Sequence, residues 1–176
     1  PGTVIAFDDP GREQGLKDAA STSVAHFDAD CRAVLDYLSQ HGKVANGKLG
    51  AGGFCIGGHL AFRAALQPDV RATVCFYPTG VHVGKLGKDA DSKTLERVNE
   101  IRGEMLIVFG SSDPHIPADG RSKIQNALKQ AGTKFSIIEY PAEHAFMRDE
   151  GPRYDPECTD RAWSEAIRFY YQIFKA

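Results

Sequence analysis

Three short segments that are predominantly apolar, without alternation, constrain the fold of this chain more than any other feature. Residues 71–77 (RATVCFY), 105–109 (MLIVF) and 135–140 (FSIIEY) show this pattern, and a glycine-rich segment over residues 47–54 precedes them. A strand that is apolar at successive positions has both faces covered, as in a parallel sheet packed between helices. The sequence therefore predicts an α/β fold built on a mostly parallel sheet.

Helical patterns separate the predicted strands, which supports the parallel arrangement. Apolar residues at helical spacing predict helices over residues 22–40, 57–66 and 118–131. A final helix is expected to begin with Asp155 as its N-cap and Pro156 at its first position. Its inward side chains are expected to be Trp163, Ala166, Ile167, Tyr170 and Ile173.

Composition and charge narrow the classes of partner. The 176 residues, of which 42% are apolar and 25% charged, are typical of a globular protein, and residues 1–176 are interpreted as a single domain. The 21 Lys and Arg residues nearly balance the 23 Asp and Glu residues. This balance argues against nucleic acid or an anionic membrane as the partner and favours a small molecule. The sequence leaves open whether the protein is a monomer or a dimer.

The four cysteines are scattered along the chain, with no CxxC motif and no close Cys/His pair, so neither a metal site nor a cofactor site is expected. Free thiols of this kind are typical of a reducing compartment, and we expect a cytoplasmic protein. Cys31 and Cys75 lie on apolar faces and are predicted to be core residues, whereas Cys158 is interpreted as a surface thiol.

A glycine-rich turn follows the first predicted strand. Its sequence, Gly53-Phe54-Cys55-Ile56-Gly57, is a nucleophile elbow in which cysteine replaces serine. The glycines are expected because strand and helix leave no room for Cβ atoms two residues on either side of a strained nucleophile. The turn presents Sγ at a helix N-terminus, where backbone dipoles favour the thiolate. The motif alone leaves open a buried structural cysteine.

Two further candidates follow later strands. Asp113 comes after the strand at 105–109 and His144 after the strand at 135–140. Functional groups of parallel α/β sheets gather at the carboxyl ends of the strands. The order Cys55, Asp113, His144 is that of the α/β-hydrolase triad. Taken singly, Asp113 could be a turn residue and His144 a loop histidine, but their joint order favours the triad.

The remaining histidines carry weaker signals. His115 lies beside the predicted catalytic acid and is interpreted as a loop or pocket-wall residue. His59 follows the elbow and is interpreted as structural or partly exposed. His26, His41 and His82 show no partner pattern.

Three motifs together resemble the dienelactone hydrolase family: GFCIGGH at Cys55, DPHIP at Asp113 and EHAF at His144. The resemblance covers nearly all of residues 10–176. It implies an α/β-hydrolase fold and hydrolysis of lactones or carboxylic esters through a Cys-His-Asp triad.

The resemblance also implies two arginines that hold a substrate carboxylate. Arg148 matches one of them and Arg12 the other. Family members carry about 60 further residues, two βα units, ahead of the position of Pro1. That part holds the second oxyanion-hole donor and an acidic residue near the cysteine, so the sequence is interpreted as the C-terminal three-quarters of an enzyme, cut or cleaved before Pro1. Residues 16–20 are small or polar where aromatic pocket residues are expected, which argues against dienelactone itself as substrate.

The predicted mechanism is nucleophilic catalysis. The Cys55 thiolate attacks a carbonyl, His144 activates the thiol and then a water, and Asp113 orients the imidazole. The N–H of Ile56 stabilises the oxyanion. Thiolate is a good leaving group, so enol-lactones, aryl esters or thioesters are expected substrates, with phosphotriesters as side substrates. The alternatives are a redox-sensing thiol protein and a peptidase or lipase on the same fold.

Overall fold

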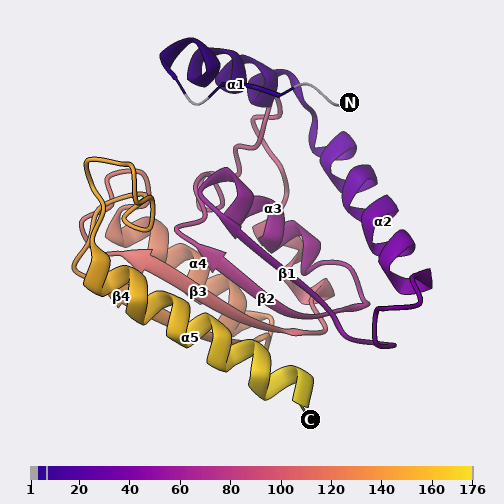
Figure 1. Ribbon diagram of the computed structural model, residues 1–176. Helices are drawn as coiled ribbons and strands as arrows, with labels where there is room; N and C mark the ends of the chain where they lie inside the picture. Colours follow the sequence, from indigo (N-terminus) through magenta and orange to yellow (C-terminus); the bar gives the residue numbers. More distant parts are fainter. Residues whose placement is uncertain (1–3, 7, 176) are drawn as a thin grey trace.

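The computed structural model describes residues 4–6 and 8–175 and is built around a parallel sheet (Figure 1). Its four strands lie in the order β1-β2-β3-β4, and every neighbouring pair is parallel. The strands are β1 (Leu49–Phe54), β2 (Val70–Phe76), β3 (Glu104–Gly110) and β4 (Lys134–Tyr140). The predicted parallel α/β arrangement is confirmed, with each strand within two residues of its expected bounds.

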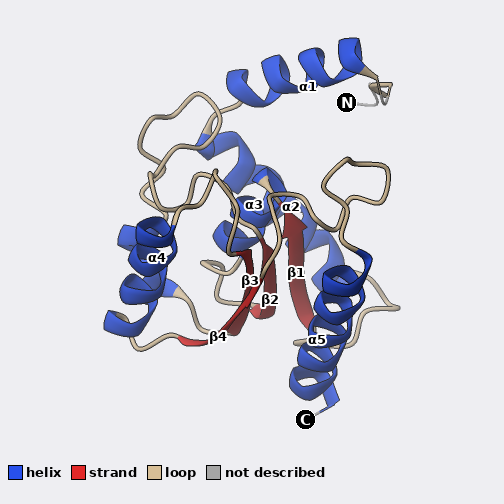
Figure 2. Cartoon of the chain, turned by 90° about the vertical axis from the view of Figure 1, so that its left-hand side faces the viewer, coloured by secondary structure: helices blue, strands red, loops and turns tan. Residues whose placement is uncertain are grey.

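Helices cover both faces of this sheet. The helices are α1 (Asp9–Ser21), α2 (Val24–Gln40), α3 (Ile56–Ala64), α4 (Ala118–Gln130) and α5 (Pro156–Lys175), and a short 3₁₀ helix, η1, spans Leu95–Glu100. Helix α5 packs on one face, while α3 and α4 lie on the other (Figures 1 and 2). Helix α1 lies apart from both layers, beyond the carboxyl ends of the strands (Figure 2).

The sandwich of helices explains the apolar patterns of the central strands. Nearly every residue of β2 and β3 is buried, and Met105, Ile107 and Phe109 in β3 have no exposed surface. The outer strands differ: among the described strands, β1 and β4 have a neighbour on one side, and each keeps several half-exposed or exposed positions. The carboxyl ends of all four strands meet at one edge of the sheet, which is where loops can bring side chains together.

Helix α1 was not predicted, because its sequence has no apolar stripe and none of its described residues is buried. Its start signal is local: Asp8 is the N-cap, and its side chain accepts a hydrogen bond from the Gly11 N–H at 2.8 Å. Its end is held by the loop after β2, where Lys88 N–H donates to Thr22 O at 3.0 Å. A Cβ on Gly87 would lie only 2.0 Å from that same oxygen, so this close approach needs glycine.

Helix α5 packs on the sheet largely through the face that the sequence predicted. Ala166 is buried, Tyr170 OH donates to Ala51 O at 2.6 Å, and the Trp163 ring, though 45% exposed, lies 5.7 Å from the rings of Phe54 and Phe76. Ile167 is 53% exposed, so its predicted inward orientation is wrong. The buried positions are Cys158, Thr159, Ala162 and Ala166. Three of these are small side chains or a thiol, which lets the helix approach the sheet closely. The interpretation of Cys158 as a surface thiol is therefore also wrong, and burial raises the pKa of this thiol.

A buried ion pair links α2 to α3. Arg63 is 4% exposed, and its Nε donates to Asp28 Oδ1 at 2.7 Å. The same guanidinium donates to Ser92 O at 2.7 Å and to Thr94 Oγ1 at 2.9 Å. Arg63 therefore fastens α2, α3 and the end of the loop after β2 to one another.

Asp28→Ala is expected to lower the free energy of unfolding by about 3 kcal/mol, because it leaves the buried Arg63 charge without its partner. Asp30→Ala, at an exposed position on the same helix, is the matched control and should change stability by less than about 0.5 kcal/mol. Urea unfolding of the two variants measures the difference. Equal stability of both would show that the Arg63–Asp28 pair contributes nothing.

Candidate active site

Cys55 occupies a strained turn between β1 and α3. Its φ of +56° and ψ of −121° lie outside the regions that L-residues ordinarily adopt, a conformation that costs roughly 1–3 kcal/mol and persists only where the surroundings impose it. The surroundings are backbone: the N–H of Cys55 donates to Phe76 O at 3.0 Å, and its carbonyl accepts from Gly58 N–H at 3.0 Å. The half-buried Sγ thus emerges at the first turn of α3.

Of the two glycines predicted to be required at this turn, one is crowded and the other is not. A Cβ on Gly53 would lie 2.0 Å from Gly57 O, as expected for a closely packed strand and helix. A Cβ on Gly57 would meet nothing within 4 Å, so the steric reason predicted for that glycine is wrong. Gly58 is the second crowded position, because its Cβ would lie 2.8 Å from Phe76 O.

The structure brings the three predicted side chains together. Asp113 lies in the loop after β3 and His144 in the loop after β4, and both are buried. His144 Nδ1 lies 2.7 Å from Asp113 Oδ2, and His144 Nε2 lies 3.2 Å from Cys55 Sγ. A carboxylate, an imidazole and a thiol are therefore connected by consecutive hydrogen bonds, the geometry of a nucleophile, base and orienting acid.

The surroundings of Cys55 and His144 favour the charged forms of both side chains. Burial acts to raise the pKa of Cys55, but hydrogen bonds from His144 and Thr79 outweigh it and bring that pKa below the ordinary thiol value. Burial acts to lower the pKa of His144, but its hydrogen bonds to Asp113 and Cys55 raise it to about 9. Both directions favour a thiolate facing an imidazolium at neutral pH.

Neighbouring groups hold the acid and the base in place. The other oxygen of Asp113, Oδ1, accepts from His115 N–H at 2.8 Å. The His144 ring meets two other rings edge to face, Tyr77 at 5.1 Å and His115 at 4.6 Å between centroids. Tyr77 itself has a positive φ of 37°, so the chain also turns sharply where β2 ends beside the site. These contacts restrict the rotation of the imidazole.

The backbone N–H of Ile56 is the candidate oxyanion donor. Ile56 is the first residue of α3, where N–H groups have no acceptor within the helix. This N–H also contributes to lowering the pKa of Cys55. An N–H in this position can stabilise negative charge on a carbonyl oxygen attacked by Sγ.

A cavity of about 580 Å³ adjoins the neighbours of Cys55. Ile56 and Thr79 line it next to the elbow, and His115 lines it from the loop after β3, as expected of a pocket-wall residue. Across from them, α1 contributes Leu16 and Ala19. Residues 16–20, which the sequence analysis described as small or polar, therefore contribute apolar side chains to the wall of this cavity.

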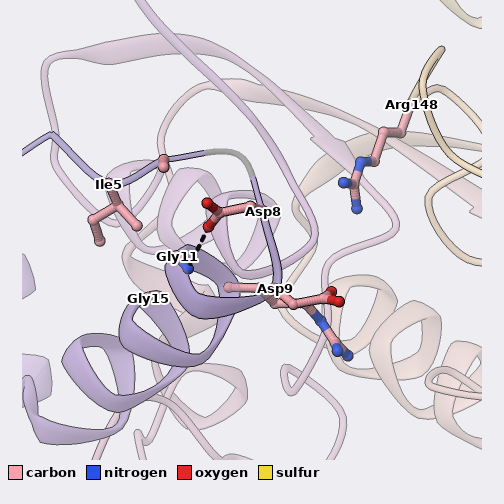
Figure 3. Close-up of a pocket in the computed structure, with 8 residues that line it drawn as sticks. Ile5, Asp8, Asp9, Gly11, Gly15 and Arg148 are labelled. Carbon is pink, nitrogen blue, oxygen red and sulfur yellow. Dashed lines mark hydrogen bonds between the residues drawn. The ribbon is translucent and has the colours of Figure 1, made fainter.

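The two predicted arginines lie together at a second cavity, of about 460 Å³, with Asp8 and Asp9. Arg148 reaches toward it from the loop after β4, and the first turn of α1 forms the opposite side (Figure 3). Arg12 belongs to α1. The residues that line this cavity are different from those beside Cys55, although α1 contributes to both.

Sequence reasoning missed Thr79, whose Oγ1 lies 3.6 Å from Cys55 Sγ, and Tyr77, which packs on His144. Both follow the carboxyl end of β2, so the strand-end rule that found Asp113 and His144 could also have found them. His59 is fully buried rather than partly exposed. Within the described part of the chain, no three His, Cys, Asp or Glu side chains are grouped to hold a metal ion.

Known proteins resemble this chain in sequence. A family model described as the dienelactone hydrolase family matches residues 4–174. A Saccharomyces cerevisiae protein named "Putative carboxymethylenebutenolidase" is 36% identical over 150 residues, which is 83% of this chain and 55% of that protein. A Synechocystis protein of the same name is 29% identical over 99% of this chain and 71% of its own length.

The fold also has a solved counterpart. The crystal structure titled "Putative Dienelactone Hydrolase" from Klebsiella pneumoniae superposes with a TM-score of 0.76 at 26% identity, covering 85% of this chain and 62% of that one. The chain spans a little over half the length of the Saccharomyces cerevisiae protein named above. Among the described residues, no helix has the length and apolar character needed to cross a membrane.

Gly58→Ala is expected to destabilise the protein by roughly 1–3 kcal/mol, because the added methyl meets backbone of β2 that cannot move aside cheaply. Gly57→Ala is the matched control: its methyl enters open space, and alanine is the better helix former by about 0.5–1 kcal/mol. Urea unfolding midpoints should therefore shift in opposite directions. A loss of stability in Gly57→Ala as large as in Gly58→Ala would contradict the assignment of the crowded position.

Proposed function

Because this chain belongs to the dienelactone hydrolase family, we propose that it hydrolyses lactones or activated carboxylic esters with Cys55 as the nucleophile. The observation that carries this proposal is the hydrogen-bonded chain from Asp113 through His144 to Cys55 Sγ, with a pKa of Cys55 below the ordinary thiol value. The substrate is a small molecule, and the free thiols suit a cytoplasmic enzyme.

Acylation begins when the Cys55 thiolate attacks the carbonyl carbon. The C–S bond forms, and the carbonyl π electrons move to the oxygen, whose negative charge the Ile56 N–H stabilises. The adduct then collapses: the bond from carbon to the alkoxy or enol oxygen breaks, and His144 Nε2 gives its proton to that oxygen. The products of this half-reaction are a thioester on Cys55 and a neutral imidazole.

Deacylation uses the same groups in reverse roles. Neutral His144 takes a proton from a water while the water oxygen attacks the thioester carbon. The second tetrahedral adduct expels Sγ with the C–S electron pair, which regenerates the thiolate and leaves the acid product. His144 is then an imidazolium again, and Asp113 stabilises its charge through the Nδ1–H bond in both half-reactions.

A thiolate nucleophile restricts the substrate class. Thiolate is itself a good leaving group, so the first adduct goes forward more readily when the departing oxygen or sulfur is also a good leaving group. Enol-lactones, aryl esters and thioesters meet this condition and are favoured over simple alkyl esters, whose leaving oxygen depends more on the proton from His144. Activated phosphotriesters are candidate side substrates, because a phosphoryl oxygen can occupy the same oxyanion site.

We extend the proposal to Arg12 and Arg148 as the groups that attract a substrate carboxylate. Both line the cavity of about 460 Å³ at the first turn of α1. A guanidinium binds a carboxylate with two parallel hydrogen bonds. Asp8 and Asp9 line the same cavity, so a substrate carboxylate competes with these side chains for the arginines.

A redox-sensing thiol protein is the second candidate, supported by the half-buried, activated Cys55. Turnover distinguishes it from a hydrolase. A sensor would oxidise at Cys55 without hydrolysing any ester, whereas the proposed enzyme forms and releases an acyl group at that sulfur.

Cys55→Ala is expected to abolish turnover of an aryl acetate and to leave the folded structure intact, because the turn depends on its glycines and not on the sulfur. Intact mass spectrometry of the wild type, quenched during turnover, should show one added acetyl group, absent from Cys55→Ala. Turnover by Cys55→Ala within threefold of the wild type would contradict the assignment of the nucleophile.

Arg148→Ala is expected to raise the KM of a carboxylate-bearing enol-lactone on the order of 100-fold, because a hydrogen bond to a charged group is lost. An aryl acetate, which carries no carboxylate, should be hydrolysed almost as before. Arg153→Ala is the matched control, since this exposed arginine lies in the same loop and lines neither cavity. Equal and weak effects on both substrates would show that Arg148 makes only a surface ion pair.

A further inference from the structure

Thr79 contacts the nucleophile through both its backbone and its side chain. Its N–H donates to Cys55 O at 3.2 Å, and its hydroxyl Oγ1 lies 3.6 Å from Cys55 Sγ. The same hydroxyl has a second acceptor, Tyr77 O, at 3.4 Å. Thr79 also lines the cavity beside the elbow.

His59 holds the backbone of Thr79 in place. His59 Nδ1 lies 3.2 Å from Thr79 O, and a carbonyl oxygen can only accept, so Nδ1 must carry the proton. Nε2 of the same neutral ring is then an acceptor, and Thr94 Oγ1 donates to it at 2.8 Å. The contacts therefore assign one tautomer of His59.

This tautomer is stable because His59 remains neutral. Burial and the nearby Arg63 charge lower the pKa of His59 to about 4. Arg63 Nη1 in turn donates to Thr94 Oγ1 at 2.9 Å, which joins the His59 ring to the ion pair with Asp28. The position of Thr79 thus depends on the fully buried, neutral ring of His59, which Thr94 holds through its other nitrogen.

We propose that Thr79 is a further catalytic residue, which donates a hydrogen bond from Oγ1 to Cys55 Sγ while the sulfur is negatively charged, and that His59 is its positioning residue. This inference rests on the proposed function. A thioester sulfur is a much poorer acceptor than a thiolate, so after acylation the hydroxyl turns to Tyr77 O and is never left without a partner.

The hydroxyl therefore acts at both ends of the reaction. It stabilises the thiolate before attack, and it stabilises the thiolate that departs when the second adduct collapses. Both effects favour the charged sulfur over its neutral forms. Their loss should therefore change how the rate of Cys55 alkylation depends on pH.

Thr79→Val removes the hydroxyl and keeps the shape of the side chain, and Thr79→Ser retains the hydroxyl. The measurement is the rate of Cys55 alkylation by iodoacetamide between pH 5 and pH 10, with the modified peptide identified by mass spectrometry. In Thr79→Val the apparent pKa should rise by about one unit, which lowers the thiolate fraction and the rate about tenfold below that pKa. Above both pKa values the thiol is fully ionised, and the two rates should converge.

Thr79→Ser should restore most of the wild-type profile. Thr133→Val is the matched control, because it removes another half-buried hydroxyl, bonded to Val98 O far from the site in the loop before β4. A Thr79→Val profile that coincides with the wild type would overturn the proposal.

The role of His59 is tested with the same assay. His59→Phe removes both ring nitrogens and should shift the profile as Thr79→Val does, while Thr79→Val combined with His59→Phe should shift it little further. Additive shifts would contradict a role through Thr79.

The alkylation assay separates this inference from the proposed function. If the wild type hydrolyses no aryl ester but Thr79→Val still shifts the alkylation profile of Cys55, the proposed hydrolase function is contradicted and the role of the Thr79 hydroxyl stands. If the wild type hydrolyses esters but Thr79→Val leaves the profile unchanged, only the inference about Thr79 is contradicted.

Discussion

The backbone turn at Cys55 is the constraint on which the rest of the site depends. Its positive φ is held by the hydrogen bond from the Cys55 N–H to Phe76 O of β2 and by the close packing of α3 against β1 and β2, which only glycine permits at positions 53 and 58. The turn places Sγ at the start of α3, where the loops after β2 and β4 bring Thr79 and His144 to it, and the loop after β3 brings Asp113 to His144. Parallel strands make this possible, since all four end at the same edge of the sheet.

The charges at the site depend on one another in the same way. Burial alone would keep both Cys55 and His144 neutral, since it raises the pKa of a thiol and lowers that of an imidazole. For His144 the opposing contribution comes first from Asp113, whose own carboxylate is stabilised by His144 and by the His115 N–H although burial opposes its charge. For Cys55 it comes from His144, Thr79 and the Ile56 N–H, so the thiolate depends on several neighbours at once.

The buried polar network behind α3 gives the site a rigid support. Arg63 and Asp28 join α2 to α3, and Thr94 and His59 extend the same network to the loop that carries Thr79. A network of this kind is costly to leave half satisfied. It therefore holds the loop after β2 in one conformation, and that loop forms both a wall of the cavity and the contact with the sulfur.

The sequence by itself determined the central strands and the identity of the Asp113–His144–Cys55 chain. Both follow from local patterns, since buried strands are continuously apolar and residues after parallel strands share an edge. It did not determine the location of α1, whose contacts are with loop backbone, or that Cys158 and Ala162 are among the most deeply buried positions of α5. The hydroxyl of Thr79 at the sulfur was likewise decided only by the tertiary structure. Such contacts depend on how closely two elements approach, a distance that no single segment encodes.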